Sequence, residues 1–188
     1  MRIGVSGAHG TGKTTLVEQL CQALPGHTQV DEPYLLLEEE GYDFSYPPSV
    51  EDYRRQLARS VTLLQERGTS LIFDRTPLDF LAYLAAVGMD ITAGRLPPRL
   101  WPAVASLDLL VIVPRSIHAA ELLPPVEMRQ LQHAMNDALV EFIYGDPLDL
   151  LADVELVEVP VALETRVRTV VRAVGDRAVT RPVAHRHR

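Results

Sequence analysis

Residues 7–14 combine glycines, one lysine and hydroxyl side chains in a spacing that can hold phosphate. They read Gly-Ala-His-Gly-Thr-Gly-Lys-Thr and complete the pattern G-x-x-x-x-G-K-[ST]. The glycines let the backbone curl, so that several N–H groups face one phosphate. Lys13 can reach the β- and γ-phosphates as a point charge, and the Thr14 hydroxyl is a hard oxygen ligand suited to magnesium. The pattern therefore indicates binding of the triphosphate of ATP, or of GTP, together with Mg²⁺.

A strand and a helix must flank such a loop, and the sequence predicts both. Residues 1–6 are short and apolar, and residues 13–24 carry apolar side chains at helical spacing. The helix would add the partial positive charge of its N-terminus to the phosphate site. A chance glycine-rich turn would lack this context, although His9, at a variable position of the pattern, could simply fill the loop. We expect the nucleotide site to comprise Gly7, Ala8, His9, Gly10, Thr11, Gly12, Lys13, Thr14 and Thr15.

Asp74 and Arg75 follow a predicted strand at residues 70–73. In a parallel sheet, the carboxyl ends of the strands line the ligand crevice. We therefore predict that Asp74 binds magnesium, directly or through water. Arg75 is predicted to contact a phosphate or the transferring group, because its planar fork suits phosphate oxygens. A structural salt bridge between the two residues is the alternative.

Glu32 occupies the corresponding place after a second predicted strand, at residues 28–30. A carboxylate there could accept a proton from an attacking hydroxyl, or orient that hydroxyl. Pro33 keeps Glu32 extended and hence aimed at the crevice. Formation of a turn is the alternative role, and it is the stronger interpretation for Asp31.

Arg115 and Arg129 flank a proline-rich loop after a fourth predicted strand, at residues 107–113. Phosphoryl transfer needs positive charge over the γ-phosphate and exclusion of water. Either arginine could close over the phosphates, and a place on the surface is the alternative. We assign Arg115 to the nucleotide and Arg129 to catalysis.

Strands and helices alternate along the chain, with a fifth predicted strand at residues 155–159. This alternation favours an α/β fold of three layers, in which helices cover both faces of a five-stranded parallel sheet. The length suits one domain, which we place at residues 1–174. Residues 175–188 contain arginines without periodicity, so we predict a flexible basic tail. Further helices are predicted at residues 34–40, 49–68, 76–87, in part of 94–106, at 125–144 and at 161–174.

The helix that begins after Ser49 has the spacing of a capping box with Asp52. It also bears polar side chains that could face a substrate, namely Gln56, Arg54, Arg55 and Arg59. A solvated helix face would explain them equally well. Aromatic side chains precede this helix, and they could line an acceptor pocket or anchor their loop to the core: Tyr42, Phe44 and Tyr46.

The composition argues against several classes of protein. With 18 basic and 25 acidic side chains the net charge is -7, which gives no general electrostatic reason to bind nucleic acid. The single cysteine, Cys21, cannot form an internal disulfide, and we expect it to be a small buried hydrophobe. No apolar run reaches the roughly 18 residues of a membrane span, and we expect a cytoplasmic protein.

With these motifs, the chain resembles the P-loop nucleoside and nucleotide kinases. Within that group it looks most like bacterial AAA-domain ATPases related to nicotinamide-riboside kinases. The resemblance is carried by VSGAHGTGKTTL (5–16), DEPYLLLEEEGYDF (31–44) and FDRTPLDFLAYL (73–84). In addition, LDLLVIVP (107–114) looks like the fourth strand of thymidylate kinases. The resemblance covers residues 1–174.

The resemblance implies a sheet with strand order 2-3-1-4-5 and Mg-ATP as the phosphate donor. It implies that Lys13 and Thr14 contact phosphate and magnesium. Asp74 and Arg75 match the acidic–arginine pair after the third strand of such kinases, and Glu32 matches the carboxylate after their second strand. A lid arginine is expected where this chain offers Arg115 and Arg129, although deoxynucleoside kinases have a denser arginine lid.

Three functions fit the sequence. The first is a kinase that transfers the γ-phosphate to a small hydroxylated metabolite, such as a nucleoside or a nucleotide. The second is a nucleotide-dependent switch or accessory ATPase that acts through a protein partner and needs no acceptor pocket. The third, an ATPase that binds nucleic acid through its basic tail, is disfavoured by the net charge. A second carboxylate at the sheet edge favours the kinase.

Overall fold

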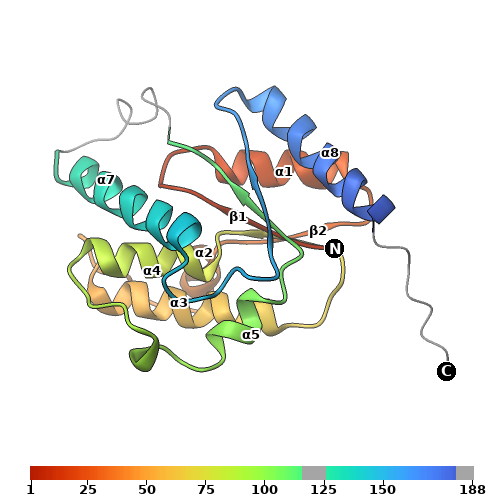
Figure 1. Ribbon diagram of the computed structural model, residues 1–188. Helices are drawn as coiled ribbons and strands as arrows, with labels where there is room; N and C mark the ends of the chain where they lie inside the picture. The colour runs from red at the N-terminus through yellow and green to blue at the C-terminus, as the bar shows by residue number, and fades with distance from the viewer. Residues whose placement is uncertain (116–125, 181–188) are drawn as a thin grey trace.

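The computed structural model describes residues 1–115 and 126–180, in which a parallel sheet forms the centre of the molecule (Figure 1). Its five strands lie in the order β2-β3-β1-β4-β5, which confirms the predicted fold class and strand order. All pairings are parallel. The strands are β1 (Arg2–Ser6), β2 (Thr28–Val30), β3 (Leu71–Asp74), β4 (Leu109–Ile112) and β5 (Glu155–Glu158).

Helices cover both faces of the sheet, as the alternating pattern predicted (Figure 1). One face packs against α1 (Lys13–Ala23) and α8 (Leu163–Thr180). The short α2 (Pro33–Glu39) follows β2 and packs on α3, and single turns occur at η1 (Ala93–Arg95) and η2 (Glu141–Gly145). The other face packs against α3 (Val50–Gln65), α4 (Pro77–Ala86), α5 (Leu100–Val104) and α7 (Val126–Val140).

The central strand β1 is covered on both faces, which explains the absence of charged side chains from its middle, residues 3–5. Ile3 and Val5 are fully buried toward α1 and α8. Gly4 lies between them and faces the opposite layer, where a Cβ atom would stand 2.6 Å from Cγ2 of Thr76. The absence of a side chain at Gly4 therefore lets the start of α4 approach β1 closely.

Two helix ends differ from the prediction. The sequence ended the last helix at residue 174, but α8 continues through Gly175 to Thr180. Arg177 holds this added length on the sheet, because it pairs with Glu155 at 2.8 Å and lies 3.7 Å from Asp108. Residues 181–188 of the predicted tail lie outside the described residues. The helix expected at residues 125–144 changes at Glu141 into one turn of π-helix.

The capping box of α3 forms as predicted. The Ser49 hydroxyl accepts from the backbone N–H of Asp52 over 3.2 Å, and the Asp52 carboxylate accepts from the Ser49 N–H over 2.7 Å. Asp52 also accepts from the Tyr42 hydroxyl over 3.0 Å, so the cap fixes the loop before α3.

Replacing Ser49 by alanine removes one partner of the capping box. We expect the free energy of unfolding to fall by about 1 kcal/mol, the usual cost of losing such a cap. Denaturant titration of the variant beside Ser70→Ala, a serine outside any cap, would measure it. Equal stability of Ser49→Ala and the wild type would show that Asp52 alone holds the helix start.

Across residues 1–115 and 126–180, none of the helices has the length and apolar character needed to cross a bilayer.

Candidate active site

The phosphate-binding loop joins the end of β1 to the start of α1 at the carboxyl edge of the sheet. At Gly7, a Cβ atom would stand 2.5 Å from the carbonyl oxygen of Val113, so no larger residue fits between the loop and the end of β4. Gly12 has a φ of 81°, in the left-handed region, and α1 begins immediately after it. The geometry required at both positions explains the glycines of the motif.

Lys13 is buried, with 4% of its surface exposed, and its ammonium group donates to the carbonyl of Ala8 over 2.8 Å. Burial, and then the neighbouring charge of Arg75, lower the pKa of Lys13 to about 7. Negative charge favours the protonated form of a lysine. A triphosphate in the loop would therefore restore the full charge of Lys13.

Thr14 and Asp74 meet as the metal prediction requires. The Thr14 hydroxyl donates to Oδ2 of Asp74 over 2.6 Å. Oδ1 of Asp74 is buried, and no described residue hydrogen-bonds to it. Burial raises the pKa of Asp74, whereas the Thr14 hydroxyl and Lys13 oppose that rise. A hydroxyl and a buried carboxylate oxygen fit Mg²⁺, which takes one or two such ligands and completes its shell with phosphate and water.

We expect Asp74→Asn to raise the Mg²⁺ concentration needed for half-maximal activity at least tenfold, because the amide brings no negative charge to the metal. The affinity for ATP should change less. A magnesium titration of the activity would measure the effect, with the exposed Asp153→Asn as a control of equal charge change. An unchanged titration curve would remove Asp74 from the metal site.

Arg75 forms its ion pair with Glu32. Its Nε donates to Oε2 of Glu32 over 2.6 Å, which links the end of β2 to the residue after β3. Arg75 has a φ of 72°, a left-handed conformation that is strained for a residue with a side chain. Burial works against its charge, but Tyr83, Glu32 and Asp79 outweigh burial and raise the pKa of Arg75. Glu32 and Arg75, both predicted to be catalytic, are therefore held together as one ion pair.

Asp79 connects this ion pair to the phosphate-binding loop. It is fully buried on α4 and accepts from the Gly7 N–H over 3.0 Å and from the Ser6 hydroxyl over 2.7 Å. It also accepts from the Thr76 N–H at the helix start, and it lies 3.8 Å from NH1 of Arg75. One carboxylate thus holds the first residue of the loop and the arginine beside the crevice.

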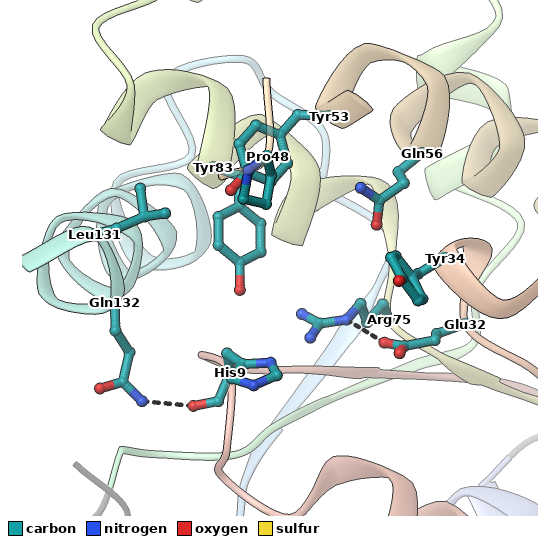
Figure 2. A pocket seen from close by; sticks show the side chains of 10 residues that line it. All are labelled: His9, Glu32, Tyr34, Pro48, Tyr53, Gln56, Arg75, Tyr83, Leu131 and Gln132. Carbon is teal, nitrogen blue, oxygen red and sulfur yellow. Dashed lines mark hydrogen bonds and ion pairs between the residues drawn. The ribbon is translucent and has the colours of Figure 1, made fainter. Parts of the chain in front are cut away.

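A cavity of about 240 Å³ opens next to the Glu32–Arg75 pair (Figure 2). Tyr53 and Tyr83 form part of its wall, with their rings stacked 4.8 Å apart and nearly parallel. Of the three aromatics considered from the sequence, none lines the cavity: Phe44 stacks on Tyr34, the Tyr42 hydroxyl donates to Asp52, and Tyr46 is exposed. The lining residues are His9, Glu32, Tyr34, Pro48, Tyr53, Gln56, Arg75, Tyr83, Leu131 and Gln132.

The two predicted lid arginines are not part of this wall. Arg115 lies after β4 and contacts Nε2 of His133 over 2.5 Å, and Arg129 is exposed on α7. In contrast, α7 reaches the phosphate-binding loop through Gln132, whose amide donates to the carbonyl of His9 over 2.5 Å (Figure 2). The assignment of a lid arginine stays a prediction.

Residues 2–119 of the chain match the AAA domain family, and this match includes every predicted site residue except Arg129. The chain belongs to the AAA domain family. No curated protein matches it in sequence.

Solved structures with the same fold as this AAA-domain protein include several kinases. A deoxyadenosine kinase from M. mycoides with bound dATP is 18% identical, with a TM-score of 0.63, and the match covers 93% of this chain and 100% of that one. A thymidylate kinase from Candida albicans is 14% identical, with a TM-score of 0.62 and coverages of 94% and 91%. A shikimate kinase from Acinetobacter baumannii in complex with shikimate is 13% identical, with a TM-score of 0.59 and coverages of 95% and 94%.

Three polar residues that contact the phosphate-binding loop of this AAA-domain protein escaped the sequence analysis. Asp79 lay inside a recognised motif, and its spacing of three from Thr76 signalled a helix cap. Gln132 gave no signal, because its contact with the loop spans most of the chain. Arg166, on α8, donates to the carbonyls of Thr11 and Pro160 over 2.7 and 2.9 Å, and it looked like one arginine among several in a predicted helix.

Proposed function

We propose that the protein is a kinase that transfers the γ-phosphate of Mg-ATP to a hydroxyl group of a small acceptor. The observation that carries the proposal is the Glu32–Arg75 pair, which lies in the wall of a cavity at the same sheet edge as the phosphate-binding loop. A switch needs the loop but has no use for an acceptor cavity with a carboxylate in its wall. The kinases among the structures with the same fold support this choice.

The transfer uses Glu32 as the group that receives the acceptor's proton. The acceptor oxygen forms a bond to the γ-phosphorus, and the bond from that phosphorus to the β–γ bridging oxygen breaks. The acceptor's proton passes to the Glu32 carboxylate, and ADP leaves with the bond's electron pair on its β-phosphate. Arg75 NH1 is buried without a hydrogen-bond partner among the described residues, and it is free to donate to the transferring group.

Lys13 and the loop N–H groups hold the donor in this scheme, and Thr14 with Asp74 would hold Mg²⁺. When bound, the metal supplies positive charge that balances the phosphate oxygens. Lys13 leaves the Ala8 carbonyl for the β- and γ-phosphates, and that exchange costs little because a buried ammonium gains a stronger partner.

The test is phosphoryl transfer from ATP, and in parallel from GTP, labelled in the γ-phosphate, to a panel of nucleosides, nucleotides and sugars. A labelled acceptor that disappears in the Lys13→Ala variant would establish the kinase and its donor. Labelled free phosphate alone, at the same rate with and without acceptors, would contradict the proposal and favour an accessory ATPase.

A further inference from the structure

The acceptor cavity contains one cationic side chain, and that cation is already paired. Among the described residues that line it, Arg75 is the only lysine or arginine, and Glu32 binds it at 2.6 Å. A second carboxylate, that of Asp79, lies 3.8 Å from the same guanidinium. Burial, with the nearby charges of Arg75 and Lys13, lowers the pKa of His9, so that His9 adds no positive charge at neutral pH. Glu32 balances the charge of Arg75, and the remaining donor of Arg75, NH1, is assigned to the transferring phosphate. An anionic acceptor would therefore meet no other cation among the described lining residues, which is strongly unfavourable.

Two of the three α3 arginines considered from the sequence bind other partners. Arg55 pairs with Glu51 at 3.3 Å, and Arg59 pairs with Glu40 at 2.8 Å. Neither lines the cavity. Arg54 is exposed, so α3 presents Gln56 to the cavity and none of these three arginines lines it.

Among the described residues beyond β4, no lysine or arginine lines the cavity. Residues 116–125 contain neither lysine nor arginine. Arg115 contacts His133, Arg129 is exposed, and neither lines the cavity. Arg115 remains assigned to the nucleotide and Arg129 to catalysis.

Three tyrosines contribute to the walls of the cavity. Tyr53 and Tyr83 lie on one side and Tyr34 on the other (Figure 2). Tyr34 is held by stacking on Phe44, with ring centroids 4.3 Å apart. Gln56 donates its amide N–H to its own helix, to the carbonyl of Asp52 over 3.2 Å, which leaves its amide oxygen to accept from a ring N–H. Aromatic faces with a few placed polar groups suit a planar heterocycle.

From the paired charge and these walls we infer that the acceptor is an uncharged compound with a planar ring and a hydroxyl group, a nucleoside and not a nucleotide or a hydroxy acid. The inference rests on the proposed kinase function and narrows its acceptor. A phosphate or carboxylate on the acceptor would lose its water shell without gaining a protein cation. A neutral base would gain contact with the tyrosine rings and a hydrogen bond to the amide oxygen of Gln56.

The test compares matched pairs on the full chain with Mg-ATP: each common nucleoside against its 5′-monophosphate, and shikimate as a hydroxy acid without an aromatic ring. The best nucleoside should exceed its monophosphate at least a hundredfold in kcat/KM. Faster transfer to a monophosphate or to shikimate would overturn the inference while leaving the proposed kinase activity in place.

Equilibrium dialysis without ATP separates the acceptor preference from the kinase activity. Binding of nucleosides without any phosphoryl transfer would contradict the proposed kinase activity and support the preference for an uncharged ligand. If neither the nucleoside nor the monophosphate of any pair bound, both the kinase activity and this preference would be overturned.

A second variant tests the charge argument directly. Gln56→Arg places an unpaired cation in the cavity wall. It should lower the ratio of kcat/KM for the nucleoside to kcat/KM for its monophosphate at least tenfold. Gln65→Arg adds the same charge at an exposed position of the same helix and should leave the ratio unchanged. An equal shift in both variants would mean that overall charge, and not the cavity, sets the preference.

Discussion

Lys13→Ala is expected to lower the rate of phosphoryl transfer at least a hundredfold. The lysine supplies the one buried ammonium group of the phosphate-binding loop, and its charge would act on the phosphate oxygens inside a site that excludes water. Removing a preorganised charge of this kind should lower the transfer rate more than it lowers the stability of the fold. Steady-state transfer by wild type and variant would measure the loss, with the exposed Arg54→Ala as a control for the loss of one cation. Activity like that of the wild type in Lys13→Ala would contradict the site.

The same substitution has a signature in stability. In the folded protein without nucleotide, burial lowers the pKa of Lys13 from 10.5 to about 7. Between those two pH values the unfolded chain binds more protons than the folded chain, so wild-type stability rises with pH through this window. Alanine cannot titrate, so the melting temperature of the wild type should rise relative to that of Lys13→Ala as the pH increases from 7 to 10. A difference that is constant with pH would mean that Lys13 stays fully charged in the free protein.

The sequence predicted those parts of the molecule that depend on local order. The strands, the helices and the loop of residues 7–14 follow from short patterns whose geometry is set within one or two turns, as the Ser49–Asp52 cap illustrates. Strand order came from the family resemblance, and the sheet confirms it. The pairing of Arg75 could not be obtained in the same way. Its partner lies on another strand, and only the assembled sheet brings Glu32 to it.

The misjudged end of α8 has the same cause. Gly175 and its neighbours Val174 and Asp176 have weak helical preference, so the local pattern indicated a tail. Contact between Arg177 and the acidic side chains of β4–β5 overrides that preference. Likewise, the spacing of Asp79 from Thr76 fits a helix cap, but only the fold shows that the same carboxylate holds the N–H of Gly7. Long-range contacts of this kind determine how the site is held, while local patterns determine which residues reach it.

Glu32→Gln is expected to reduce kcat roughly a hundredfold, the low end of the contribution of a group that takes a proton in the transition state. Glutamine has nearly the same shape, and its amide oxygen can still accept from Nε of Arg75, so Arg75 should keep its position. The variant therefore loses the proton acceptor while keeping the arrangement of the cavity. Steady-state kinetics should show a fall in kcat with little change in KM for ATP.

Two further variants separate proton acceptance from positioning. Glu32→Ala removes both, because it also releases Arg75 from its ion pair at 2.6 Å, and it should raise KM for the acceptor as well as lower kcat. Glu39→Gln, at an exposed position of α2, makes the same chemical change away from the cavity and should leave both constants unaltered. If Glu32→Gln retained wild-type kcat while Glu32→Ala lost it, Glu32 would act by holding Arg75 and not by accepting the proton. Dissociative transfer makes that outcome chemically reasonable, since the attacking hydroxyl then keeps its proton until late in the reaction.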